Sequence, residues 1–173
     1  MCVSIVMSVD PRVAALGYCV WKEEDFRGEG PVVLPVTAGI VQTPKNLKGS
    51  YVQQVDALMK EIDCIAQGCR VAGVWCEEPQ FFGNLLGRAA VTDVLHISFM
   101  CGSLSEWSRE RGAEFHPAPV MQWKGNMSKH QVAQRIRNRY SKTPHGLRRL
   151  MSPNTSHDWD ALGIGLWGQG RFQ

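Results

Sequence analysis

Long hydrophobic runs and paired metal-binding cysteines are both missing from this sequence of 173 residues. No apolar run approaches the roughly 18 residues that cross a bilayer, so we expect no membrane partner. The six cysteines form no C-x-x-C pair, and several lie within apolar runs, where a free cysteine behaves as a small buried hydrophobe. These patterns argue against a zinc site and a disulfide framework, and they indicate a reducing compartment.

Acidic residues are also missing from one long stretch, between Glu114 and Asp158. Residues 1–114 carry a net charge of −4, whereas residues 115–173 carry +7. The basic residues of the acid-free stretch are Lys124, Lys129, Arg135, Arg137, Arg139, Lys142, Arg148 and Arg149. Because a basic block releases counterions when it neutralises phosphates, the stretch indicates binding to nucleic acid. The alternative is an ordinary solvated basic face.

The remaining composition is that of a folded protein. An apolar content of 44% with 20% charged residues predicts one globular domain over residues 1–173. The first apolar stretch is short, has no basic flank and is followed directly by Asp10. We therefore interpret it as the first strand rather than a signal peptide, and expect a cytoplasmic protein.

Apolar periodicity and turn residues predict an α/β fold. Strands are expected over residues 2–9, 14–21, 32–42, 71–76 and 113–117, and helices over 51–67, 84–111, 127–140 and 157–167. Loops are expected at 23–30, 44–49 and 141–154. Ser50 and Ser156 are expected to cap the helices that follow them. This order describes a mixed sheet, an antiparallel meander followed by two crossover units.

Carboxylates follow two of these strands. Asp10 comes after the first strand, and Glu77 and Glu78 come after the all-apolar fourth strand. Sites in such sheets form at the carboxyl ends of strands, although an Asp before Pro also starts turns. Glu77 is favoured because it directly continues the strand, and Glu78 remains an alternative. Gly17, within the second strand, indicates close approach of another backbone or of a ligand.

A third acidic signal lies near the C-terminus. His157 and Asp160 are three residues apart and share one face of the predicted helix. Asp160 is either a metal ligand or a border residue of that helix, whereas Asp158 fits ordinary charge placement at a helix start. His157 could bind metal, or orient or deprotonate a water. Carboxylates gathered in this way bind Mg²⁺, and two such ions can activate a phosphodiester, so we predict a metal-dependent nuclease.

Three aromatic residues could contribute to the same function. Phe81 and Phe82 are adjacent and follow the acidic pair. They could stack on an unpaired base or wedge a junction open, or they could simply pack beneath their loop. Trp123 is interpreted as a core anchor, with a stacking platform as the alternative.

These motifs resemble RuvC-type Holliday junction resolvases of the RNase H-like superfamily, in particular divergent bacteriophage versions. Residues 10–18 resemble the family's D-P-G-x-x-x-x-G-Y/W motif, with Arg12 where Gly is usual. Glu77 matches the Glu that ends the fourth strand, and Phe81 or Phe82 matches an aromatic wedge. Residues 119–124 and 129–132 resemble P-x-x-V-K and K-x-Q-V, and residues 157–162 resemble D/H-x-x-D-A-L.

The resemblance implies an RNase H-like fold, in which a five-stranded mixed sheet with three antiparallel first strands is flanked by helices. It implies metal ligands at Asp10, Glu77, His157 and Asp160, which would hold two Mg²⁺ ions per site, with Mn²⁺ as a substitute. Lys124 and Lys129 would lie near the cleaved strand, and Lys129 would assist catalysis.

The implied activity is symmetric nicking of a four-way DNA junction by a homodimer, leaving a 5′-phosphate and a 3′-hydroxyl. The implied location is the cytoplasm of a bacterial or phage-infected cell. DNA contacts are expected from Lys124, Lys129, Arg135, Arg137, Arg139, Phe81 and Phe82. The alternatives are a nuclease for other branched or flapped DNA, and a DNA-binding module without catalysis.

Overall fold

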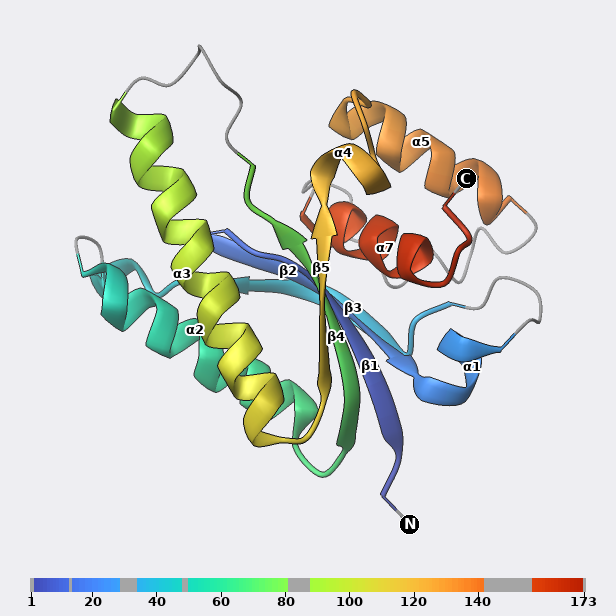
Figure 1. The fold of residues 1–173 in the computed structure, drawn as a ribbon, viewed down its shortest axis with the longest axis horizontal. Helices are drawn as coiled ribbons and strands as arrows, with labels where there is room; N and C mark the ends of the chain where they lie inside the picture. Colours follow the sequence, from blue (N-terminus) through green and yellow to red (C-terminus); the bar gives the residue numbers. More distant parts are fainter. Residues whose placement is uncertain are drawn as a thin grey trace.

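A computed structural model describes residues 2–12, 14–28, 34–47, 50–80, 88–141 and 157–172. Its strands form one sheet in the order β3-β2-β1-β4-β5 (Figure 1). The strands are β1 (Ser4–Asp10), β2 (Ala15–Lys22), β3 (Thr37–Gln42), β4 (Arg70–Glu78) and β5 (Glu114–Pro119). β1, β2 and β3 pair antiparallel, whereas β4 runs parallel to both β1 and β5. The predicted mixed sheet with an antiparallel start is confirmed.

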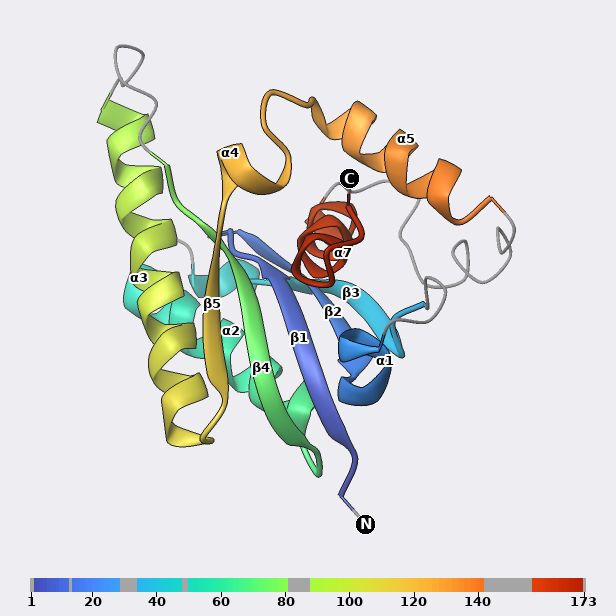
Figure 2. The ribbon, with the colours of Figure 1, turned by 45° about the vertical axis from the view of Figure 1, so that its right-hand side comes forward.

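Helices cover both faces of this sheet (Figures 1 and 2). The helical elements are α1 (Glu23–Arg27), the 3₁₀ turn η1 (Lys45–Leu47), α2 (Tyr51–Ala66), α3 (Arg88–Glu110), α4 (Val120–Trp123), α5 (Lys129–Arg139) and α7 (His157–Gly168). α2 and α3 lie on one face, and α7 lies on the other with α5 outside it. None of the helices within the described ranges is long and apolar enough to cross a membrane.

Several predicted boundaries were wrong. The segment expected to be a loop at 23–30 begins with helix α1, because Phe26 is buried and three acidic residues occupy the first turn, which the helix dipole favours. β3 begins only at Thr37, after Pro35, which lacks an N–H for the ladder; residues 29–33 lie outside the described ranges. The loop expected at 44–49 contains η1, and the short helix α4 was not predicted.

Of the two predicted helix caps, the one within the described ranges is not formed by a side chain. Ser50 precedes α2, but its side chain makes no capping hydrogen bond. Ser128 precedes α5 and forms a full capping box with Gln131. Ser156 and residues 84–87, the expected start of the long helix, lie outside the described ranges.

Strand alternation decides which side chains reach the α7 face. Ile5, Met7 and Val9 of β1 pack beneath α2 and α3, so the alternating Val6, Ser8 and Asp10 face α7. In the parallel register Val9 lies opposite Cys76. Continuing that register by one residue places Asp10 beside Glu77, at the carboxyl edge of the sheet.

α7 packs unusually deeply against the sheet. Every residue from Asp158 to Leu166 is buried, as expected for a helix that is apolar on nearly all sides. Its N-terminus crosses β2 at Gly17, where an added Cβ would lie 2.1 Å from the carbonyl oxygen of His157. The prediction that Gly17 marks close approach of another backbone is confirmed. Because Gly17 pairs with Asp10, this crossing brings the start of α7 to Asp10.

Candidate active site

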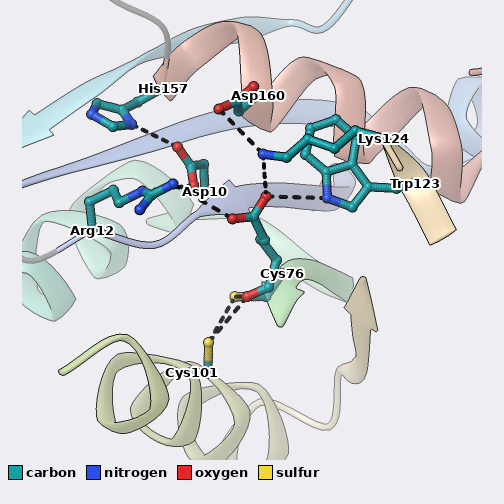
Figure 3. Close-up of polar contacts among 9 residues, drawn as sticks. Asp10, Arg12, Cys76, Cys101, Trp123, Lys124, His157 and Asp160 are labelled. Carbon is teal, nitrogen blue, oxygen red and sulfur yellow. Dashed lines mark hydrogen bonds and ion pairs between the residues drawn. The ribbon is translucent and has the colours of Figure 1, made fainter. Parts of the chain in front are cut away.

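Three carboxylates from distant parts of the chain lie near one another at the carboxyl ends of β1 and β4, where Arg12 and Lys124 contact them in pairs; Figure 3 labels Asp10 and Asp160. Asp10 ends β1, Glu77 lies one residue before the end of β4, and Asp160 lies in the first turn of α7. Asp10 is 0% exposed, Glu77 7% and Asp160 1%. Burying carboxylates is costly unless they are paired or bind a metal, so these three groups require positively charged partners.

His157 contacts the cluster through Asp10. Its Nδ1 lies 2.7 Å from Asp10 Oδ2, and the ring is only partly exposed. Because a carboxylate oxygen accepts hydrogen bonds, Nδ1 is the donor toward Asp10, and in the neutral imidazole tautomer that fits this contact Nε2 keeps the free lone pair. The nearby carboxylate thus orients the ring and sets which nitrogen can accept a proton or bind a cation.

The single turn α4 supplies two further contacts to Glu77. Trp123 donates its indole N–H to Glu77 Oε2 at 3.2 Å, and Lys124 Nζ donates to the same oxygen at 3.2 Å. Lys124 Nζ also lies 3.9 Å from Asp160 Oδ2 and 4.7 Å from the Trp123 ring centroid. Trp123 is buried among core residues, as predicted. Its hydrogen bond to Glu77 was not predicted, because it depends on how α4 docks after β5.

Arg12 is the second cation of the site. Its Nε lies 3.6 Å from Asp10 Oδ1, and a terminal nitrogen lies 3.8 Å from Glu77 Oε1. The guanidinium therefore bridges two carboxylates that the sequence predicted to be metal ligands. The sequence marked Arg12 only as a departure from a glycine, with no sign of this contact.

Burial and mutual repulsion shift the pKa values of two carboxyl groups. Desolvation, followed by repulsion from Asp10, raises the pKa of Glu77, while Lys124 and Arg12 oppose the rise. The same two causes, in the same order, raise the pKa of Asp160 to about 6, with Lys124 opposing. Both shifts show that the local cations compensate the clustered negative charge only in part.

The donor set fits hard divalent cations. Asp10 Oδ1 and both carboxylate oxygens of Asp160 are buried without a hydrogen-bond partner. Unsatisfied carboxylate oxygens are the ligands that Mg²⁺ prefers. In the described ranges no three His, Cys, Asp or Glu side chains converge on one point as a preformed metal site. Arg12 and Lys124 instead make contacts to these carboxylates (Figure 3).

Two acidic residues considered as alternatives lie elsewhere. Glu78 is exposed and, by strand alternation, points to the opposite face from Glu77. It borders a cavity of about 400 Å³ next to Cys76 and Cys101, two free thiols whose sulfurs lie 3.6 Å apart. Asp158 is buried and accepts a hydrogen bond from the backbone N–H of Trp159, in keeping with a role at the helix start.

The basic residues of α5 lie on its exposed surface. Lys129, Arg135, Arg137 and Arg139 are all exposed. Lys129 at the start of α5 is among the cations that lower the pKa of Asp160, so its charge acts on the site. Arg135 and Arg139 share one side of the helix, whereas the Arg137 guanidinium lies 4.8 Å from the Trp159 ring centroid. Phe81, Phe82, Lys142, Arg148 and Arg149 fall outside the described ranges.

The strand order, strand directions and helix placement define an RNase H-like α/β fold, and structural comparison agrees. Thermus thermophilus RuvC in complex with a Holliday junction substrate matches with a TM-score of 0.65 and 23% identity, over 94% of this chain and 90% of that chain. A second Thermus thermophilus RuvC structure matches with a TM-score of 0.60 and 20% identity, over 96% of this chain and 97% of that chain. No protein-family model and no curated protein sequence matches. The chain therefore has the RuvC fold at low sequence identity.

Replacing Asp160 by Asn is expected to stabilise the metal-free protein at neutral pH. Because the pKa of Asp160 is raised from 3.8 to about 6, the folded state holds more protons than the unfolded state between these values. Stability is therefore lost as pH rises through that window. The isosteric amide does not ionise and avoids this loss, so the free energy of unfolding of Asp160→Asn should exceed that of wild type by about 3 kcal/mol at pH 7.5.

Urea unfolding of both proteins in EDTA, at pH 4 and pH 7.5, measures this effect. The stability gap between Asp160→Asn and wild type should be much larger at pH 7.5 than at pH 4. A gap that does not change with pH would show that ionised Asp160 is not destabilising.

Proposed function

We propose that this protein is a divalent-metal-dependent endonuclease that nicks DNA four-way junctions. The observation that carries the proposal is the clustering of three buried carboxylates, two of them with oxygens that lack a hydrogen-bond partner, at the carboxyl edge of a RuvC-type fold. The solved relative bound to a Holliday junction supports this choice of substrate.

Asp10, Glu77, Asp160 and His157 would hold the metal, two Mg²⁺ ions per site, with Mn²⁺ as a substitute. When bound, the metal would activate water and neutralise charge that develops on the phosphate. His157, oriented through Nδ1 by Asp10, would hold or accept a proton at Nε2. The ammonium groups of Lys124 and Lys129 would stabilise the negative charge of the scissile phosphate. The products would carry a 5′-phosphate and a 3′-hydroxyl.

DNA would be held by the basic surface next to the carboxylates. Lys129, Arg135, Arg137 and Arg139 of α5 would contact phosphates, and the Phe172 and Trp159 rings would position the Arg135 and Arg137 guanidinium groups. Phe81 and Phe82, beyond the end of β4, would contact bases at the branch point. A two-fold symmetric homodimer would present two such sites to the two symmetric strands of a junction.

Two other functions share parts of this description. A nuclease for flaps or forks would use the same fold and metal site. A DNA-binding module without catalysis would use only the basic surface, but clustered buried carboxylates repel phosphate and destabilise the fold, so they favour a catalytic site.

The proposal is tested by comparing the cleavage of a labelled four-way junction with that of a matched linear duplex, each in Mg²⁺ and in EDTA. We expect Mg²⁺-dependent nicks confined to symmetric positions at the junction, and DNA ligase should reseal them if the ends are 5′-phosphate and 3′-hydroxyl. Equal cutting of flaps and forks would favour the broader nuclease. Tight junction binding without cutting in Mg²⁺ or Mn²⁺ would favour the binding module.

A further inference from the structure

Arg12 lies between Asp10 and Glu77, the two carboxylates that the sheet itself brings side by side. We propose that Arg12 is an internal counter-ion that competes with divalent cations for these carboxylates, so that the DNA-free protein binds metal weakly. This inference rests on the proposed function, since it assigns a role to a residue of the same site.

The contacts of Arg12 are electrostatic rather than hydrogen-bonded. Its two distances to carboxylate oxygens, 3.6 and 3.8 Å, exceed hydrogen-bond length, and its buried Nε has no hydrogen-bond partner. The side chain is 35% exposed, whereas Asp10 is fully buried. Charge attraction thus holds Arg12 in place, and the partial exposure of its side chain leaves it free to move toward solvent.

Lys124 differs from Arg12 in how firmly it is held. Its side chain is only 13% exposed, it donates to Glu77 at 3.2 Å, and its ammonium lies over the Trp123 ring. A cation that enters the cluster would therefore displace Arg12 more readily than Lys124. The Arg12 charge also lies close enough to Asp10 and Glu77 to repel an incoming divalent ion directly.

Displacement gives Arg12 a second role. A guanidinium pairs with phosphate through two parallel hydrogen bonds, a better geometry than either of its present contacts. DNA phosphates would draw Arg12 away from Asp10 and Glu77 and free the carboxylate oxygens for metal. By linkage, metal and DNA would then bind with positive cooperativity.

Metal binding to the DNA-free protein tests this inference without any cleavage assay. We would titrate Mn²⁺ and Mg²⁺ by calorimetry into wild type, Arg12→Gln, Arg12→Lys and Arg70→Gln. Arg70 is the matched control, because it is exposed and lies at the opposite end of β4 from Glu77. Arg12→Gln should bind metal at least about tenfold more tightly than wild type, Arg12→Lys should stay near wild type, and Arg70→Gln should be unchanged.

Thermal unfolding provides a second readout. Without metal, Arg12→Gln should melt a few degrees below wild type, because Asp10 and Glu77 lose a counter-ion. Saturating Mg²⁺ should raise its melting temperature more than that of wild type. Equal metal affinity and equal melting behaviour in Arg12→Gln and wild type would overturn the role of Arg12. If wild type and Arg12→Gln both fold yet bind no metal, the metal site of the proposed function itself fails.

Discussion

Asp10→Asn is expected to abolish cleavage while junction binding stays equal or becomes stronger. Asp10 is fully buried, lies within hydrogen-bond distance of His157 and has one oxygen without a hydrogen-bond partner. The isosteric amide would keep the packing but remove a negative metal ligand and the group that orients His157. The cleavage rate should fall by about 10³-fold or more, equivalent to about 4 kcal/mol of transition-state stabilisation.

Single-turnover cleavage and gel-shift binding of the same labelled junction measure the two effects separately. Asp56→Asn is the matched control, because Asp56 is exposed on α2 and pairs only with nearby Lys60 in the described contacts. It should leave both measurements unchanged. If Asp10→Asn lost binding and cleavage together with its fold intact, Asp10 would be a DNA-binding rather than a metal-binding residue.

The acidic pair at the end of β4 should separate in the same assay. Glu77→Gln is expected to lose cleavage to a similar extent as Asp10→Asn, whereas Glu78→Gln should retain it within a few-fold. The reason is strand alternation, which buries Glu77 beside Lys124 and leaves Glu78 exposed on the other face. If Glu78→Gln lost cleavage while Glu77→Gln cleaved at the wild-type rate, Glu78 rather than Glu77 would be the residue of the site.

Gly17→Ala should destabilise the protein by about 3 kcal/mol and strongly reduce cleavage. The added methyl group would lie 2.1 Å from the His157 carbonyl oxygen and 2.9 Å from the Asp158 backbone nitrogen. Both are backbone atoms of a helix buried against the sheet, so relief requires α7 itself to move. That movement would carry His157 and Asp160 away from Asp10.

Urea unfolding measures the loss, and Gly102→Ala provides the control. Gly102 lies within α3, and apart from the backbone of its own helix no described heavy atom would lie within 4 Å of its added Cβ. There the substitution should stabilise the protein by about 0.5–1 kcal/mol, since alanine favours a helix. If Gly17→Ala were as stable as wild type, α7 would not approach β2 as closely as described.

Local sequence patterns predicted the parts of the fold that depend on local physics. The apolar runs and turn residues predicted the strands and main helices, and the mixed sheet follows from their order. The close approach at Gly17 was also predicted, because it reflects a requirement of one residue, whereas the capping box of Ser128 and Gln131 was not predicted. α1 was missed, because its helix depends on Phe26 packing into the core.

The candidate ligands were predicted from local patterns: Asp10 and Glu77 from strand ends, and His157 and Asp160 from helical spacing. Asp10, Glu77 and the His157–Asp160 pair do lie together, although their role as metal ligands remains a proposal. The contacts of Arg12 and the Trp123 hydrogen bond had no sequence signal. The contacts of Arg12 and Trp123 to Glu77 each join residues more than 40 positions apart, and no periodicity encodes such pairs.

By itself, the sequence determined the α/β architecture, the basic C-terminal third and the residue types at the strand ends, because hydrophobic periodicity and charge are local properties. Only the tertiary structure decided that Glu77 rather than Glu78 faces Asp10. It also decided that α7 crosses β2 closely enough to place His157 Nδ1 2.7 Å from Asp10 Oδ2. Only it showed that Arg12 and Lys124 partly neutralise the buried carboxylates. These features depend on register and on helix docking, which the packing of the whole core sets at once.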